Sequence, residues 1–206
     1  PLSSPRQPLE AQTVMLRQSR RFGGQIGQWA LAINSGQCPS DLLSAEPHSP
    51  AVCWHGAQAK THWLGPVLRG RSVTEGGVTT QVPGFEAYAQ RLKHKPQTAD
   101  AHAQWVREVL RAFDEVRVLC AVHDGPWGVD ALNQVCIQAL TQAAYLRPEG
   151  LWYVGRPIIV TRNDPGLGVF NGDVGVVLPA PPATQPAEPT LRAYFLQGDD
   201  IHSVSV

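Results

Sequence analysis

Two adjacent arginines, Arg20 and Arg21, are the side chains whose type and position best suit chemistry in this sequence. They follow Thr13–Leu16, a short run of strand-like composition, and they precede the start of a helical pattern. In open α/β sheets, ligands bind beyond the carboxyl ends of the strands, and an arginine there can hold a phosphate through two parallel hydrogen bonds. The same pattern also fits surface arginines beside a helix start, so both interpretations stay open on residue type alone.

Other catalytic motifs are missing from the 206 residues. The sequence has no G-x-x-x-x-G-K-[ST] loop for nucleotide phosphates, and no apolar strand runs into an Asp-Glu pair. It also has no G-x-S-x-G, no H-E-x-x-H and no Cys–His nucleophile arrangement. The four cysteines form no C-x-x-C pair, so zinc is not expected. An isolated enzyme built from these residues alone is therefore not expected.

The composition indicates a globular chain with many turns. A hydrophobic content of 43% supports a packed core, while 19 glycines and 18 prolines favour loops. The formal net charge is zero, so bulk charge gives no sign of nucleic-acid binding. The first 100 residues carry ten basic and six acidic side chains (+4), and the remainder carry seven and eleven (−4). No signal peptide or apolar run of membrane length is present, so we predict a cytoplasmic protein with no membrane contact.

Residues 1–146 are predicted to form an α/β region. Strand-like Thr13–Leu16 precedes a helix that Gly36 can end. Residues 39–83 are rich in Pro, Gly, Ser and Thr, and we expect an irregular insertion there. Val116–Val122 is almost entirely apolar, which predicts a strand buried on both faces. Helical spacing of apolar residues recurs in four sets: Ile26, Trp29, Ala30 and Ile33; Phe85, Tyr88, Ala89 and Leu92; Val106, Val109, Leu110 and Phe113; Val129, Leu132, Cys136, Ala139, Leu140 and Ala143.

Residues 147–206 are predicted to form a small antiparallel β-barrel. Short apolar runs alternate here with turns of Pro, Gly, Asn and Asp, and a proline-rich loop joins two of the runs. This spacing is typical of barrels built from short strands. The expected strands are Leu151–Thr161, Val174–Leu178, Arg192–Gln197 and Ile201–Val206.

The segment Arg162–Pro179 concentrates turn formers between two of these strands. Asn171 and Gly172 suit a turn with positive φ angles, and Gly175 suits a bulge or a sharp bend within a strand. Architecture therefore accounts for most of this segment without any chemistry.

Three segments together resemble the RecD family, the alpha subunits of exodeoxyribonuclease V (the RecBCD helicase–nuclease). They read LRQSRRFGGQIGQWALAINSG, RVLCAVHDGPWGVDALNQ and GRPIIVTRNDPGLGVFNGDVGVVLP, and they occur in the family's order. The element FNGDVG alone is shared more widely among RecD-like superfamily 1 helicases. Residues 39–83 resemble no part of the family that we can assign.

The resemblance implies a fold and a place within a longer protein. Residues 1–146 would be part of the second RecA-like motor domain, and residues 147–206 would be an SH3-like barrel truncated at its C-terminal end. The family's Walker A and Walker B motifs would lie before Pro1, and a late Gln-Gly motif would lie beyond Val206. ATP and Mg²⁺ are then expected as cofactors of the whole protein, with none bound by this segment.

The resemblance also gives Arg21 a role. The sequence Ser19-Arg20-Arg21-Phe22 resembles the family's Ser-Tyr-Arg-Phe, the fourth helicase motif. Arg21 matches the arginine implied to reach the γ-phosphate of ATP from across the cleft between the motor domains. An arginine there senses the nucleotide and stabilises charge that develops on hydrolysis. Arg20 replaces the usual aromatic residue, so ring stacking is not implied at that position.

RecB and RecC are the implied partners, with the nuclease centre in RecB. The family's motor is implied to move 5′ to 3′ along the 5′-ended single strand during double-strand break repair. Such motors contact backbone and bases without sequence choice. The candidates for these contacts are Arg162, Asn163, Phe170, Asn171 and Trp127. Each is also explained as a turn or core residue, and the core interpretation is favoured for Phe170.

Two other functions stay open. One is a stand-alone RecD-like helicase that works without RecB and RecC. The other is a non-enzymatic adaptor whose SH3-like barrel binds a protein, but such a peptide groove needs clustered exposed aromatic residues. The aromatic residues after Pro148 are Trp152, Tyr153, Phe170, Tyr194 and Phe195, and several are expected to be buried. The N-terminal sequence of the parent protein would separate a complex subunit from a stand-alone helicase.

Overall fold

The computed structural model describes residues 24–38, 63–75, 77–182 and 190–206. The chain divides into two compact units, one made of residues 1–59 with 73–78 and the other of residues 60–72 with 79–206. The strand expected at Thr13–Leu16 lies outside the described residues. In the described part of the chain, no helix is both long enough and apolar enough to cross a membrane.

Helix α1 (Gly24–Asn34) is the described helix of the first unit, and it confirms the helical spacing of its apolar residues. Gly36 has a φ of +79°, and its N–H donates to the carbonyl of Ile33 at 3.0 Å. A left-handed glycine that closes the last turn in this way is a common helix end. The predicted stop signal is therefore confirmed.

The segment expected to be irregular contains regular structure after residue 63. Helix α2 (Leu64–Arg69) is followed by strands β1 (Arg71–Glu75) and β2 (Val78–Val82), which form a two-stranded sheet. These elements are too short to develop a sustained apolar period, so composition alone suggested a loop. Residues 39–62 lie outside the described part.

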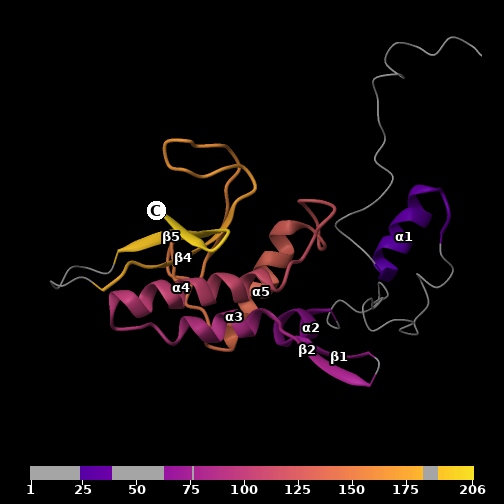
Figure 1. The fold of residues 1–206 in the computed structure, drawn as a ribbon, viewed down its shortest axis with the longest axis horizontal. Coiled ribbons are helices and arrows are strands. Elements are labelled where there is room, and N and C mark those ends of the chain that lie inside the picture. The colour runs from indigo at the N-terminus through magenta and orange to yellow at the C-terminus, as the bar shows by residue number, and fades with distance from the viewer. Residues whose placement is uncertain (1–23, 39–62, 76, 183–189) are drawn as a thin grey trace, which may run out of the picture. The chain divides into compact units, whose positions relative to one another are not determined.

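Helices α3 (Phe85–Leu92) and α4 (Ala99–Asp114) form an antiparallel pair in the second unit (Figure 1). Phe113, near the end of α4, packs against Tyr88 of α3 with ring centroids 5.1 Å apart. At the other end, Trp105 Nε1 donates to the carbonyl of Arg91 at 2.8 Å. Thr98 caps α4 by accepting from the N–H of Ala101 at 3.4 Å. The predicted apolar faces of both helices are buried, as are those of the next helix at Leu132 and Leu140 of α5 (Val129–Gln142).

A four-stranded antiparallel sheet follows the helices in the order β3-β4-β5-β6. Its strands are β3 (Pro157–Ile159), β4 (Val174–Pro179), β5 (Leu191–Gln197) and β6 (Asp200–Ser205). The last three confirm the sequence prediction to within a residue or two at each end. The expected α/β class is thus confirmed as a mixture of helices and antiparallel sheets, whereas the RecA-like and SH3-like identities stay predictions.

Both faces of this sheet are covered, which explains why β4 is almost uninterrupted in its apolar sequence. Val176 and Leu178 share a core with Tyr88, Val106 and Val109 on the α3–α4 side. On the opposite face, Ala193 and Phe195 pack with Val169, which comes from the loop before β4. Successive residues of a strand point to opposite faces, and Val177, between Val176 and Leu178, is also fully buried.

Leu151–Thr161 was expected as one long strand, and the structure corrects this. The strand itself spans only Pro157–Ile159, and most of residues 151–156 form bends and turns. Gly155 has a φ of +87°, which breaks an extended conformation. A Cβ at Gly155 would lie 2.5 Å from Leu92 Cδ1 and 2.8 Å from Leu146 Cδ2, so this turn packs tightly against the helices.

Val116–Val122 was expected as a strand buried on both faces, and this prediction is wrong for the structure described. These residues form no strand, and Leu119 is 92% exposed. A strand of this composition needs neighbours on each side to bond its backbone and cover its faces. Among the described residues, strand pairing is confined to the β1–β2 hairpin and the four-stranded sheet, apart from a single bridge between Asp164 and Val169.

Gly175 also differs from the expectation of a bulge or bend. Its pairing within the sheet is continuous, opposite Ile158 on one side and Phe195 on the other. A Cβ there would lie 2.7 Å from Phe195 Cδ1. Glycine therefore serves here to let the Phe195 ring approach the backbone.

The end of β4 is fixed to helix α4 by a buried histidine. His102 Nε2 lies 2.9 Å from the carbonyl oxygen of Pro179, and Tyr194 Oη lies 3.4 Å from the same oxygen. One residue later, the N–H of Ala180 donates to the carbonyl of Thr190 at 2.8 Å. The two ends of the connection between β4 and β5 are thereby joined next to the helix.

Candidate nucleic-acid interface

The loop of residues 162–173 is ordered by hydrogen bonds within itself. Asp164 and Val169 form an isolated antiparallel bridge, in which the two backbone N to O distances are 2.8 Å and 3.1 Å. The Asp164 carboxylate accepts from the N–H of Leu167 at 3.0 Å. Asn163 Oδ1 accepts from the N–H of Asn171 at 2.8 Å, which ties the two turns of the loop together. Asn163, a predicted DNA contact, therefore has a structural role.

The second turn of the loop runs from Phe170 to Asp173. The N–H of Asp173 donates to the carbonyl of Phe170, and the N–H of Phe170 donates to the Asp173 carboxylate, both at 2.9 Å. Gly172 has a φ of +95°, which confirms the positive φ expected there. Asn171 does not have a positive φ, so the pattern is that of a type II turn rather than the expected left-handed pair.

Two side chains from the neighbouring sheet also bond to the backbone of the loop. His202 Nε2 lies 2.6 Å from the carbonyl oxygen of Leu167, and Gln197 Nε2 donates to the carbonyl of Gly168 at 3.0 Å. A carbonyl only accepts, so the His202 proton must be on Nε2. The turn formers of this segment thus build a rigid loop on one face of the sheet.

Two side chains of the loop are left available to a ligand. Arg162 is exposed, and it makes no hydrogen bond or ion pair in the described part of the chain. Phe170 is 50% exposed, so the core interpretation favoured for this ring is wrong. Asn171 is exposed and contributes its backbone N–H to the loop. A cation and an aromatic ring on a rigid loop suit contacts to a nucleic-acid strand.

Trp127, the other predicted contact, lies in the turn before α5 and is 42% exposed. Its ring packs beside that of Trp63, with centroids 6.4 Å apart and an angle of 55° between the planes. Trp63 was missed because it belongs to the segment that was expected to be irregular. Within the described residues, no hydrogen bond or ring contact joins Trp127 to the 162–173 loop.

Arg20 and Arg21 lie outside the described residues. The structure therefore assigns no geometry to the predicted γ-phosphate contact of Arg21, which stays a prediction. Among the described residues, no cluster of three His, Cys, Asp or Glu side chains is arranged to hold a metal ion.

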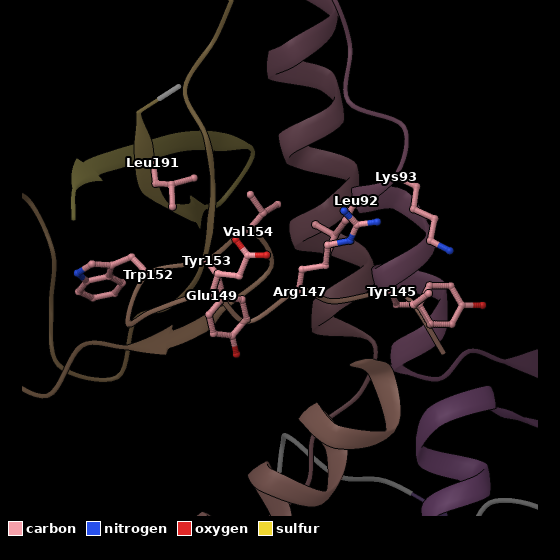
Figure 2. Close-up of a pocket in the computed structure, with 10 residues that line it drawn as sticks. Leu92, Lys93, Tyr145, Arg147, Glu149, Trp152, Tyr153, Val154 and Leu191 are labelled. Atoms are coloured by element: carbon pink, nitrogen blue, oxygen red, sulfur yellow. The ribbon is translucent and has the colours of Figure 1, made fainter. Parts of the chain in front are cut away.

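A groove of about 740 Å³ lies between the end of α3, the segment that follows α5 and the turns before β3 (Figure 2). Leu92 and Tyr153, both buried, are among its lining residues. More exposed side chains of both charges and of aromatic type complete it. The lining residues are Leu92, Lys93, Ala144, Tyr145, Arg147, Glu149, Trp152, Tyr153, Val154 and Leu191.

Both cations and aromatic rings line this groove. Figure 2 shows Trp152 at one end, Lys93 with Tyr145 at the other, and Arg147 between them. The Lys93 ammonium lies 4.3 Å from the centroid of the Tyr145 ring. Burial raises the pKa of Tyr153, so its hydroxyl stays protonated and neutral at physiological pH. None of these residues is among the predicted site residues, and Trp152 and Tyr153 lie in a segment for which the sequence predicts a strand.

The floor of the groove is supported by a buried tyrosine. Tyr88 Oη donates to the carbonyl of Gly155, and burial raises the pKa of Tyr88 well above its ordinary value. The N–H of Gly155 donates in turn to the carbonyl of Val177 at 2.8 Å. The turn that carries Trp152 and Tyr153 is thus bonded both to α3 and to the central strand β4.

The sequence is similar to that of RecD proteins over most of its length, although no protein-family model matches it. It is 36% identical over 166 residues to the RecBCD enzyme subunit RecD of Mycolicibacterium smegmatis, which covers 81% of this chain and 26% of that protein. The corresponding subunit of Mycobacterium tuberculosis H37Rv is 35% identical over 173 residues, covering 84% and 26%. That of Haemophilus influenzae is 40% identical over 174 residues, covering 79% and 26%.

This chain therefore spans about a quarter of the length of the curated relatives it matches. The matched length of 166 to 174 residues extends well beyond the three short segments that first carried the resemblance. The resemblance to RecD is confirmed.

Proposed function

From its similarity to RecD subunits over four fifths of the chain, we propose that this chain serves as part of the RecD subunit of an ATP-dependent DNA helicase–nuclease. The observation that carries the proposal is this identity to three RecD subunits, each named as part of a RecBCD enzyme. RecB and RecC are then its partners, and double-strand break repair and recombination are its setting. Similarity to subunits of a complex favours this function over a stand-alone helicase or an adaptor.

In fold, we assign residues 1–146 to part of a second RecA-like motor domain and residues 147–206 to an SH3-like barrel. The four antiparallel strands with apolar residues on both faces support the barrel. The identity to RecD subunits over most of the chain supports the motor domain.

Arg21 is the residue to which we give a role in ATP hydrolysis. Its position in the motif-like Ser19–Phe22 suits a contact to the γ-phosphate, where its charge would favour hydrolysis. ATP and Mg²⁺ would be held elsewhere in the subunit. None of the helices in the described part carries a lysine in its first turn, as a P-loop does. These residues do not fit a nucleotide cradle, and we derive no step through one.

The described residues contribute instead to holding the translocating strand. Arg162 and Phe170 on the rigid 162–173 loop supply a phosphate contact and a stacking surface. Trp127, together with Trp63, supplies a second aromatic surface. Contacts of this kind choose no sequence, as a motor that moves 5′ to 3′ along single-stranded DNA requires.

The test is a comparison of strand polarity in the purified complex. The complete protein that carries this chain should co-purify with RecB and RecC, and its removal should abolish 5′-to-3′ movement while 3′-to-5′ movement by RecB remains. Unwinding by the complete protein alone, without partners, would support a stand-alone helicase instead. Loss of neither polarity on removal would leave the adaptor as the better interpretation.

A further inference from the structure

We propose that the groove lined by Lys93, Arg147 and Trp152 binds one unpaired nucleotide of single-stranded DNA. The base would lie against Trp152, and the adjoining phosphate would lie at Arg147 and Lys93. The inference rests on the proposed function and adds to it a site away from the 162–173 loop and the Trp63–Trp127 pair.

The dimensions of the groove suit such a ligand. Its volume of about 740 Å³ is within the range of small-molecule sites, which run from roughly 300 to 1,000 Å³. It is an open groove rather than an enclosed cavity, as a site for a continuous strand must be. Buried Leu92 and Tyr153 form an apolar lining beneath the exposed side chains, which suits the face of a base.

The cations in the groove are available for a phosphate. In the described part of the chain, neither the Arg147 nor the Lys93 side chain makes a hydrogen bond or an ion pair, and the Lys93 ammonium lies over the Tyr145 ring. Glu149 lines the same groove and is likewise without an ion pair there. The lining thus carries one net positive charge, and Glu149 would keep the phosphate on the Arg147 and Lys93 side.

Trp152 is held in place although it is exposed. The residue is 41% exposed, and the guanidinium carbon of Arg156 lies 5.7 Å from the centroid of its ring. That guanidinium is itself fixed, because Arg156 Nη1 donates to the carbonyl of Leu151 at 2.6 Å. A large exposed ring steadied by a cation is arranged for stacking, which loses less conformational entropy on binding than a mobile ring would.

An acidic peptide is the other macromolecule that cations and rings could attract. Single-stranded DNA is favoured because each nucleotide carries one flat ring and one phosphate, and the groove is lined by the rings of Trp152 and Tyr145 and by the cations of Arg147 and Lys93. A protein ligand would be expected to need a larger apolar surface.

The test measures binding of a fluorescein-labelled oligo(dT) to the complete protein in its native complex, by anisotropy at several KCl concentrations. Trp152→Leu should weaken binding roughly tenfold without changing the salt dependence, because it removes stacking on one base. Arg147→Gln should lower the slope of log K against log salt by about 0.7, because one phosphate contact to a single strand is lost. Trp152→Phe should retain most of the affinity, and Lys95→Gln is the matched charge control outside the groove.

Photocrosslinking with oligo(dT) that carries 5-iododeoxyuridine then locates the strand. Crosslinks to the segment around Trp152 support the site, and crosslinks confined to other segments overturn it. Protection by excess dTMP but not by unlabelled oligo(dT) would reassign the groove to free nucleotides. Loss of RecB or RecC from Trp152→Leu complexes with unchanged DNA affinity would reassign it to a protein.

The remaining outcomes separate this site from the proposed function. If the wild-type complex binds oligo(dT) and both groove variants behave like Lys95→Gln, the groove is not a DNA-binding site, while the proposed function stands. If the wild-type complex does not bind oligo(dT) at all, both are overturned. Equal melting temperatures of the variants and the wild type exclude unfolding as the cause of any loss.

Discussion

The 162–173 loop and the Val116–Val122 run are opposite in sequence and opposite in what they need from the rest of the chain. The loop is polar and rich in turn formers, yet its backbone is bonded by its own residues and by two side chains of the neighbouring sheet. The run is apolar and strand-like, yet it forms no strand, and Leu119 is 92% exposed. Turn chemistry acts over a few residues, whereas a buried strand depends on partners distant in sequence.

The largest effect is expected at Arg21, which precedes α1 and would act only with the rest of the motor. In the complete protein, Arg21→Ala should leave ATP binding largely intact and lower kcat by roughly 10³-fold, at the low end for an arginine finger. Steady-state ATPase assays with single-stranded DNA check this, and Arg20→Ala is the matched neighbour, with a small effect expected. An unchanged kcat would remove Arg21 from the nucleotide cleft.

Leu119→Asp tests directly whether the apolar run has partners in the complete protein. If the run is a strand of the motor domain there, placing a carboxylate on it should lower the free energy of unfolding by roughly 3 kcal/mol or more. Leu167→Asp, on the exposed part of the loop, should change it by less than about 0.5 kcal/mol. Urea titrations of both variants make the comparison. Similar small effects would show that the run stays exposed.

Gly155→Ala tests the turn that supports the groove. A side chain there would have a φ of +87° and would meet Leu92 and Leu146, so the free energy of unfolding should fall by roughly 3 kcal/mol. Gly150→Ala is the control, because Gly150 has a φ of +75° with no atom within 4 Å of an added Cβ. Gly150→Ala should lower the free energy of unfolding by only about 1 kcal/mol. Equal costs in urea denaturation would mean that packing at Gly155 is not tight.

Gly172→Val tests the loop as a piece of architecture. The φ of +95° makes a β-branched residue unfavourable, although nothing crowds the position. We expect a loss of roughly 1–2 kcal/mol in a thermal or urea melt. A melt identical to that of the wild type would contradict the left-handed turn.

Arg162→Ala should have the smallest effect on stability and separate the loop's two possible roles. Its melting temperature should be unchanged, while the slope of log K for single-strand binding against log salt should fall by about 0.7. Asn163→Ala should instead lower stability by about 1 kcal/mol, because the N–H of Asn171 loses its acceptor. Equal slopes for Arg162→Ala and wild type would reduce the loop to architecture.

The same division separates what sequence reasoning could predict from what it could not. The helical spacing of Tyr88 and Leu92, or of Val106 and Phe113, reflects a single buried face, and both helices were predicted correctly. Gly172 was predicted because a turn near Asn-Gly needs a positive φ. The groove around Trp152 was missed, because Gly155 turns the chain where Leu92 and Tyr88 meet it, and those two contacts span more than sixty residues. The exposure of Phe170 was likewise a matter of tertiary packing.

The bond between Ala180 and Thr190, beside the carbonyl of Pro179 that faces His102, also has a practical use. This bond fixes the point where the chain leaves β4 and the point where it enters β5. The length of the connection between them should therefore have little effect on the stability of the core. The free energy of closing a loop rises only by about 0.6 kcal/mol for each doubling of its length. An epitope or a fluorescent peptide inserted between these two residues would therefore report on the assembled protein without disturbing the sheet, and homologues are free to vary in length at this point.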